Sequence, residues 1–395
     1  MEKKLSLYIH IPFCVKKCAY CDFYSICDLS QTEAYVKALI AQIKTFRIHR
    51  KSYLVDTIYI GGGTPSLLTG GQMLRVIEAV RKTFKVSPDA EITMEANPGT
   101  LDTEKLAGYH EAGINRLSMG LQSADNGELA MLSRIHTKEQ FESSFLLARL
   151  EGFDNINVDL MYALPNQNQK TLFKTLDYVM AMEPEHISFY GLTIEPATPF
   201  GQDPDILKKI PDDDEQADLY LAAADKLEHG GFLQYEISNF AKPGFECRHN
   251  LNFWTGEEYL GFGPAAHSIF KGTHFSYAKE FLRFIDAPTD RELLLEENEA
   301  FTEDDLAKQF VMLGFRLKNG VDVKKYNQRF IKNFDEEYFE KLKPFLQKPP
   351  MGGEPYMLKT PNGYRLSRKG MLMSNEILRE ILAEDDEPVL TESKV

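Results

Sequence analysis

The sequence predicts an α/β protein: a partial (β/α)6 barrel followed by a smaller, mostly helical, winged-helix-like domain. Six short apolar segments recur in the first half of the chain, and amphipathic helical patterns separate them. Strand–helix units in series favour a parallel sheet with right-handed crossovers. A partial or complete β/α barrel fits this series best, and a doubly wound open sheet is the structural alternative. After about residue 200 the alternation ends, which indicates a different architecture.

The predicted barrel elements follow from hydrophobic periodicity and from capping residues. Strands are expected at Leu5–Ile11, Thr57–Ile60, Glu91–Ala96, Arg116–Gly120, Asn155–Met161 and His186–Leu192. Helices are expected at Thr32–Arg47, Gly71–Thr83, Asp102–Ala112, Lys138–Leu150 and Gln169–Met182. Capping-box patterns at Ser30–Glu33 and Thr137–Gln140 support the first and fourth helix starts, and Gly113 suits a left-handed end of the third helix. In either sheet architecture, a site belongs at the C-terminal ends of the strands.

The second half of the chain has a different pattern. Asp212–Gly230 is typical of one more helix, and Tyr235–Ser268 is rich in glycine, asparagine and aromatic residues. From about residue 290 the pattern predicts two helices, a β-ribbon at Tyr356–Leu366 and a last helix at Lys369–Leu382. We therefore expect a barrel domain over residues 1–289, in which 200–289 form an extension, a winged-helix-like domain over 290–383 and an acidic tail over 384–395.

The composition and charge argue against several classes of protein. The 395 residues carry a formal charge of −14, and a surface of that sign repels polyanions, which argues against a nucleic-acid partner. The chain has no apolar run long enough for a membrane-spanning helix. The segment Met1–Leu7 leads into a strand-like run without the features of a secretory signal, so we expect a cytoplasmic protein. No basic amphipathic helix indicates a membrane surface, and peripheral contact is left open.

Three of the five cysteines, Cys14, Cys18 and Cys21, lie within eight residues directly after the first predicted strand. In a reducing compartment such clustering indicates metal or redox chemistry rather than disulfides. Three thiolates can hold a [4Fe–4S] cube and leave one iron open. A zinc site with Cys27 as fourth ligand is one alternative, although the cysteines do not form two close pairs. Three packed thiols are another, although the two lysines between Cys14 and Cys18 indicate an exposed loop.

Polar residues also follow the later strands. Gly61–Pro65 comes after the second strand and holds three glycines, which let a ligand approach the backbone closely. Glu95 ends the third strand, and Asp159 lies on the fifth. Taken alone, the glycines are equally typical of a turn, and Glu95 of a helix cap. Because the C-terminal ends of barrel strands meet at one mouth, we expect these groups to form one pocket.

The C-x3-C-x2-C spacing, followed by Gly61-Gly-Gly-Thr-Pro65, resembles the radical SAM superfamily. That resemblance implies a [4Fe–4S] cluster whose open iron binds S-adenosylmethionine (SAM) and whose electron cleaves it to a 5′-deoxyadenosyl radical. Over nearly the whole chain, these elements resemble the family of the oxygen-independent coproporphyrinogen III oxidases (HemN) and the related heme chaperones (HemW). The positions that would contact SAM are Tyr8, Tyr20, Gly62, Gly63, Thr64, Glu95, Gln122, Arg134, Asp159 and Thr193. Some of these contact a second SAM in the oxidases, so the number bound is open, and no catalytic residue is assigned.

Three features favour the chaperone branch of this family. Phe23 stands where the oxidases have a further cysteine, and the first strand begins near residue 5, without their longer N-terminal extension. The segment Arg248-His249-Asn250-Leu-Asn-Phe253-Trp254 is similar to the H-N-x-x-Y-W element that is linked to heme handling in the chaperones, with Phe253 in place of tyrosine. Histidine is a common axial ligand of heme iron, which makes His249 the candidate. A hydrogen bond within an aromatic loop is the alternative role for His249.

The resemblance implies a chaperone that binds heme and a SAM-liganded [4Fe–4S] cluster and transfers heme to apo-hemoproteins. The alternatives are oxidative decarboxylation of coproporphyrinogen III and radical SAM modification of RNA, against which the acidic charge argues. The implied partners are heme or a porphyrinogen, an apo-hemoprotein acceptor and an electron donor such as a flavodoxin or a ferredoxin, and a homodimer is left open. The sequence assigns no role to Cys27, Cys247 or His267.

Overall fold

The computed structural model describes residues 3–46, 52–349 and 352–383. The predicted acidic tail and Arg47, the predicted end of the first helix, lie outside these residues. The described chain forms two compact units. The first holds most of the residues up to Ala300, and the second holds the residues from Phe301 onward together with the short segments Gln234–Ile237 and Trp254–Gly256.

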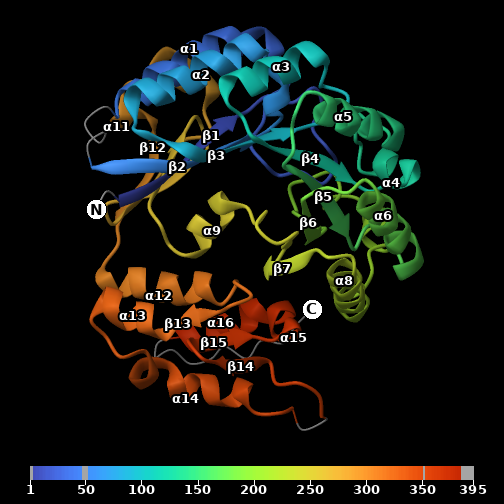
Figure 1. Ribbon diagram of the computed structural model, residues 1–395, viewed down its shortest axis with the longest axis vertical. Coiled ribbons are helices and arrows are strands. Elements are labelled where there is room, and N and C mark those ends of the chain that lie inside the picture. Colours follow the sequence, from blue (N-terminus) through green and yellow to red (C-terminus); the bar gives the residue numbers. More distant parts are fainter. Residues whose placement is uncertain (1–2, 47–51, 350–351, 384–395) are drawn as a thin grey trace. The chain divides into compact units, whose positions relative to one another are not determined.

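Six parallel strands in sequential order form the centre of the first unit, and helices follow their outer side (Figure 1). The strands are β1 (Lys3–Ile11), β2 (Tyr53–Gly62), β3 (Val86–Ala96), β4 (Arg116–Gln122), β5 (Ile156–Tyr162) and β6 (His186–Gly191). The helices are α1 (Thr32–Lys44), α2 (Gly70–Thr83), α3 (Thr103–Ala112), α4 (Asn126–Met131), α5 (Lys138–Leu150) and α6 (Gln169–Ala181). Because the strand order never reverses, the predicted partial β/α barrel is confirmed and the doubly wound alternative is wrong.

The segment after β6 lengthens the sheet at both edges. Beside β6 lie β8 (Asn239–Ala241) and β7 (Leu233–Glu236), and beside β1 lie β9 (Tyr259–Phe262), β10 (His267–Phe270), β11 (Thr273–Tyr277) and β12 (Leu295–Ala300). Only β9 of these is parallel to its barrel neighbour, with Tyr8 opposite Gly261. The helices of this segment are α7 (Pro204–Leu207), α8 (Asp213–His229), α9 (Arg248–Trp254), α10 (Phe281–Asp286) and α11 (Arg291–Leu294). The sheet is therefore an open curve of twelve strands.

Strand β1 shows how the sheet positions the site. Its residues Leu5, Leu7, Ile9 and Ile11 are fully buried. Burial of one such side chain contributes about 1.5–3 kcal/mol, which fixes the strand in the core. Because side chains alternate along a strand, Ser6, Tyr8 and His10 lie on the opposite face. These three side chains line a cavity.

Capping residues place two helix ends as predicted, and a third capping residue starts a predicted helix. Thr137 and Gln140 form a reciprocal capping box at the start of α5. Gly113 ends α3 in the left-handed conformation, with φ of 92°. Asp212 caps α8, and the predicted helix there is confirmed.

Three local predictions need correction. The two helices expected between about residue 290 and the β-ribbon are wrong, because α11 is followed by helices at Glu303–Gly314, Val323–Phe330 and Phe334–Leu346. The capping box at Ser30–Glu33 is wrong, because Asp28 caps a short 3-10 turn ahead of α1 and the residue before α1, Gln31, makes no side-chain capping bond. The single last helix is also wrong. Met373 departs from helical geometry, with ψ of 14°, and divides that segment into α15 (Arg368–Leu372) and α16 (Ser374–Leu382).

The second unit has the element order of a winged helix. Its elements are α12 (Glu303–Gly314), β13 (Val321–Asp322), α13 (Val323–Phe330), α14 (Phe334–Leu346), β14 (Met357–Thr360), β15 (Gly363–Leu366), α15 and α16. The strands form an antiparallel sheet in the order β13-β15-β14, which confirms the predicted β-ribbon. Tyr326, Phe334 and Tyr364 are buried at the centre of its core. No helix in the described part of the chain is both long enough and apolar enough to span a bilayer.

Candidate functional site

The cysteine loop that follows β1 faces a cavity of about 430 Å3. Cys14, Cys18 and Cys21 all line this cavity, which we call the thiol cavity. The N–H of Cys14 donates to the carbonyl of Ile26 at 2.9 Å, and the N–H of Ala19 donates to the carbonyl of Leu132 at 3.3 Å. These backbone hydrogen bonds hold the loop at the C-terminal ends of the strands, which is the position that the sequence predicts.

The surroundings of the thiols fit an iron–sulfur cluster. Burial raises the pKa of Cys14 and of Cys21, and neighbouring thiols add to this. Arg134 Nη1 lies 3.7 Å from Cys18 Sγ, and a positive charge there stabilises thiolates once metal displaces their protons. Among the described residues no fourth cysteine lines the cavity, and Cys27 is exposed, which argues against a four-thiolate zinc site. Three thiols fit a cube with one open iron.

Two half-buried carboxylates, Glu95 on β3 and Asp159 on β5, line the same cavity. The Tyr59 hydroxyl donates to Glu95 Oε1 at 3.0 Å, and the N–H of Gly62 donates to Oε2 at 3.1 Å. Burial, and then the charge of Asp159, raises the pKa of Glu95 to about 7. Burial also raises the pKa of Asp159, although the hydrogen bond that Asn157 donates to it acts to lower that pKa. A ligand ammonium group would relieve the repulsion between these carboxylates.

Two polar atoms at this cavity, Gln122 Oε1 and Arg134 Nε, have no hydrogen-bond partner among the described residues. Arg134 Nη2 donates to the carbonyl of Gly120 at 2.8 Å, which orients the guanidinium group. Gln122 has a φ of 67°, a left-handed conformation that non-glycine residues adopt at a cost. Because an unpaired buried polar group costs about 1–3 kcal/mol, both atoms fit a bound polar ligand.

Most of the predicted SAM positions come together in the thiol cavity. Its lining includes Tyr20, Gly62, Gly63, Thr64, Glu95, Gln122, Arg134 and Asp159. Tyr8 lines a neighbouring cavity instead, and Thr193 is an exposed residue after β6. Sequence reasoning missed Tyr59 and Tyr190, which line the thiol cavity from β2 and β6. The signal was available, since each alternates with buried apolar residues along its strand.

A second cavity of about 430 Å3, which we call the aromatic cavity, shares Phe23 with the first. Its lining is Ser6, Tyr8, His10, Asp22, Phe23, Tyr24, His249, Phe253, Glu257, Tyr259, Ala265, His267 and Lys279. The rings of Tyr8 and Tyr59 stack with centroids 6.3 Å apart, so this pair forms part of the wall between the cavities. An apolar pocket with a few convergent polar groups is typical of a ligand site.

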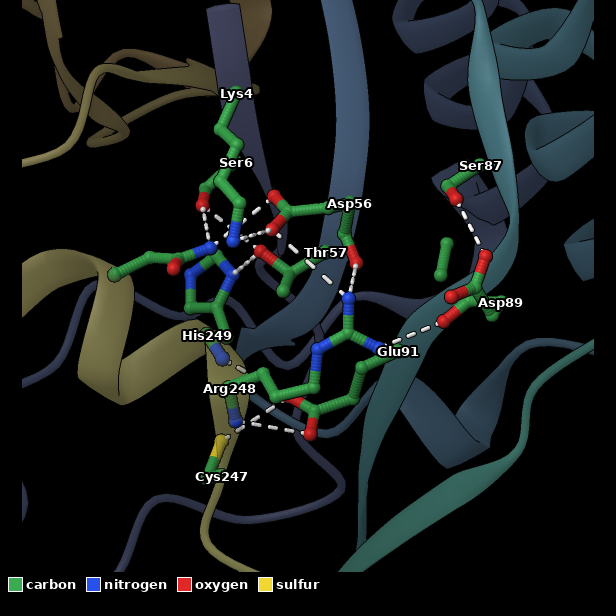
Figure 2. Close-up of polar contacts among 12 residues, drawn as sticks. Lys4, Ser6, Asp56, Thr57, Ser87, Asp89, Glu91, Cys247, Arg248 and His249 are labelled. Carbon is green, nitrogen blue, oxygen red and sulfur yellow. Dashed lines mark hydrogen bonds and ion pairs between the residues drawn. The ribbon is translucent and has the colours of Figure 1, made fainter.

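His249 lines the aromatic cavity, and its ring lies beside Ser6 and Thr57 of the sheet (Figure 2). The Thr57 hydroxyl donates its proton to Ser6 Oγ at 2.8 Å, and it lies 3.0 Å from His249 Nδ1. Thr57 therefore accepts from Nδ1–H, which leaves Nε2 as the nitrogen with a lone pair. Burial lowers the pKa of His249 to about 3, so the ring is neutral at physiological pH. Sequence reasoning weighed a hydrogen bond against a ligand role for His249, and the contact of Nδ1 with Thr57 confirms a hydrogen bond.

A buried carboxylate on β3 anchors the start of α9, which carries His249 (Figure 2). Glu91 accepts from the N–H of Arg248 at 2.9 Å and from the N–H of His249 at 3.0 Å. The Cys247 thiol donates to the same carboxylate at 3.4 Å, which gives Cys247 a structural contact that the sequence did not suggest. Arg248 Nη1 also donates to the carbonyl of Asp89 at 2.7 Å. These contacts fix the backbone that leads into His249.

Comparison with known proteins gives two family matches. Residues 8–179 match the radical SAM superfamily, and residues 301–373 match the HemN C-terminal domain. The solved structure of coproporphyrinogen III oxidase (HemN) from Escherichia coli, a radical SAM enzyme, superposes with a TM-score of 0.81 at 26% identity. That superposition covers 96% of this chain and 90% of the HemN chain.

Two curated relatives are similar at the level of sequence. The heme chaperone HemW of Escherichia coli (strain K12) is 43% identical over 265 residues, which are 67% of this chain and 69% of that protein. The heme chaperone HemW of Bacillus subtilis (strain 168) is 33% identical over 385 residues, which are 96% of this chain and 99% of that protein.

Proposed function

Because this chain belongs to the HemW family of heme chaperones within the radical SAM superfamily, we propose that it binds heme and transfers it to apo-hemoproteins. The observation that carries the proposal is the aromatic cavity, which His249 lines while the Thr57 hydroxyl holds its Nδ1 at 3.0 Å. A neutral imidazole nitrogen whose other nitrogen is held by a hydrogen bond is the usual form of a heme or metal ligand.

The rest of the aromatic cavity suits a porphyrin. Tyr24, Phe253 and Tyr259 supply aromatic surface for the macrocycle. The Lys279 ammonium group is a partner for a propionate carboxylate. Phe253 has no hydroxyl, so the tyrosine of the family element offers no ligand here, and His249 is the axial ligand we propose.

The thiol cavity would hold the cofactors of the superfamily. We propose that Cys14, Cys18 and Cys21 hold the [4Fe–4S] cluster, and that Tyr20, Gly62, Gly63, Thr64, Glu95, Gln122, Arg134 and Asp159 surround SAM. When bound, the cluster and SAM supply one-electron chemistry, for which an electron donor such as a flavodoxin or ferredoxin is the expected partner. Tyr59 fixes the orientation of Glu95, and Asp159 adds the second negative charge that attracts an ammonium group.

Heme titration of the anaerobically reconstituted full-length protein tests this proposal. We expect a shifted Soret band and quenching of Trp254, the only tryptophan. His249→Ala should weaken heme binding at least about tenfold, since even the loss of a residue that orients a ligand costs about that much. Thr57→Val should weaken it less, and His110→Ala, which removes an exposed histidine on α3, should leave it unchanged. Absence of binding at micromolar heme, or wild-type affinity in His249→Ala, would contradict the assignment.

A second candidate function is oxidative decarboxylation of coproporphyrinogen III. The structural likeness to HemN favours this function. So does Phe23, which lines both cavities, because a porphyrinogen in the aromatic cavity would lie beside the thiol cavity. Incubation with SAM, a reductant and coproporphyrinogen III, with heme offered in parallel, separates the two functions. Formation of protoporphyrinogen would favour the oxidase, whereas heme transfer to an apo-hemoprotein without porphyrinogen turnover would favour the chaperone.

A further inference from the structure

Three side chains that the proposed function does not require come together on the outer strands β10, β11 and β12. His267 on β10 pairs with Ser276 on β11, and Ser276 pairs with Glu297 on β12. His274 lies two residues before Ser276 on β11, so all four side chains project from the same face of the sheet. We propose that His267, His274 and Glu297 form a binding site for a divalent transition-metal ion such as Zn2+.

The distances fit a metal with little rearrangement. One ligand atom from each of the three residues lies within 4.8 Å of the other two. His267 Nδ1 and His274 Nε2 are 3.3 Å apart, and His267 Nδ1 and Glu297 Oε2 are 4.0 Å apart. Tetrahedral zinc with bonds of about 2.0–2.2 Å spaces its ligand atoms roughly 3.3 Å apart. The two nitrogens already have this spacing, and a small shift of the exposed Glu297 side chain brings in the carboxylate.

The chemistry of the cluster also suits a cation. The imidazole rings stack at 22°, and their nitrogens are close enough to share a proton that a metal would replace. Buried Ser276 donates to Glu297 Oε2 at 3.1 Å, which orients the carboxylate as an outer-shell partner does in metal sites. Glu296 adds negative charge near His267, and Lys279 adds positive charge.

The expected ion follows from the ligand set. Two imidazoles and one carboxylate suit Zn2+ and its first-row neighbours and leave a coordination position for water. Side-chain exposures of 52% for His267 and 56% for Glu297 leave solvent a path to the site. Its place in the fold is the rim of the aromatic cavity, because His267 lines that cavity while His274 and Glu297 do not.

The test uses cluster-loaded, full-length protein with Cys27→Ser, which removes an exposed thiol that could bind zinc. Equilibrium dialysis against Zn2+ with elemental analysis should show one zinc per chain beyond the cluster. His274→Ala and Glu297→Gln should each weaken this binding at least about tenfold, and His229→Ala, an exposed histidine on α8, should not. Co2+ bound to the variant that also lacks the three cluster cysteines should show the d–d absorption of a low-symmetry site.

The outcomes are distinguishable from those of heme binding. His274→Ala should lose zinc and keep heme, because His274 does not line the aromatic cavity. The metal site would be overturned if wild type, His274→Ala and Glu297→Gln bound zinc with equal affinity, whatever the result with heme. Loss of heme binding in His249→Ala with zinc retained would support both assignments.

Discussion

Glu95 is a half-buried carboxylate whose charge changes close to neutral pH. Its raised pKa, about 7, means that it is largely protonated one pH unit below neutrality and largely ionised one unit above. Only the ionised form attracts an ammonium group. The proposed SAM site should therefore bind more tightly as pH rises through the pKa.

The first prediction is a pH dependence of SAM affinity. Between about one unit below and one unit above that pKa, affinity should rise by up to about tenfold, because the ionised fraction of the carboxyl group rises from about one tenth to about nine tenths. Calorimetry on cluster-loaded protein measures it. Glu95→Gln should bind more weakly and show a flat profile, and a Glu95→Gln profile with the wild-type slope would assign the titration to another group.

Single residues differ in how well the sequence predicted their place. Glu95 and Asp159 were placed correctly, because strand ends of a parallel barrel converge whatever the loops do. Tyr8 was assigned to SAM, but the stacked pair with Tyr59 places it on the aromatic side of the wall. Thr57 was not singled out at all. Its role depends on a contact with a residue on α9, and local patterns do not reveal such contacts.

The glycine turn after β2 has little space for side chains. Gly62 has a φ of 114°, and a Cβ there would lie 2.6 Å from the His10 ring. Gly71, close by in helix α2, has nothing within 4 Å of its Cβ position. The two glycines therefore form a matched pair, one required by the turn and one replaceable.

The second prediction compares alanine at these two positions. Gly62→Ala should destabilise the protein by about 1–3 kcal/mol, since the residue must hold a sparsely populated conformation against a side chain that fills its space. Gly71→Ala should be neutral or stabilising by up to about 1 kcal/mol, because alanine favours a helix over glycine. Urea unfolding of both variants measures this. Equal midpoints would show that the Gly62 turn adapts without cost.

Elements with strong periodicity were predicted, and those held by distant contacts were not. The helices α2, α5 and α8 begin within one residue of their predicted starts because their capping residues are local signals. Strand β3 is longer than predicted, because Pro88 and Asp89 disfavour a strand and yet lie within it. The short helix α4 was missed, since one turn and a half is too short to show a helical period.

On the scale of the molecule, two cavities with different lining chemistry share one wall. Phe23 lines both, and it lies two residues after Cys21, a proposed ligand of the cluster. Phe23 is also 72% exposed, so few contacts fix its position when the loop is free. A cluster that holds the cysteines would order the wall of the aromatic cavity in advance of heme.

The third prediction is coupling between the two cavities. Loading the cluster should tighten heme binding at least about fivefold, the lower end of usual coupling between sites, because the ordering cost of the loop has then been met. Heme titrations with and without the cluster measure the factor. Phe23→Ala should reduce it, and Phe245→Ala, a surface phenylalanine that lines neither cavity, should not. Equal heme affinity in both states of the wild type would exclude the coupling.

The fold class was predictable as a whole, but the width of the sheet was not. Six strand–helix units in series left few topologies open, because crossovers keep one hand and connections stay short. Nothing in the local pattern of Tyr259–Phe262 shows that it pairs with β1, at the far end of the sequence. The aromatic cavity depends on that pairing, so the sequence predicted His249 as a candidate but not the cavity around it.

The pairing of β1 with both β2 and β9 has a consequence for synthesis on the ribosome. Every residue that lines the thiol cavity has been made once Asn239 is joined to the chain, whereas the aromatic cavity lacks its last wall until Lys279. A nascent polypeptide can thus assemble its cysteine site first, with one edge of β1 still unpaired and open to other strands. A chain that is released from the ribosome between these two points would be prone to aggregate and unable to receive heme.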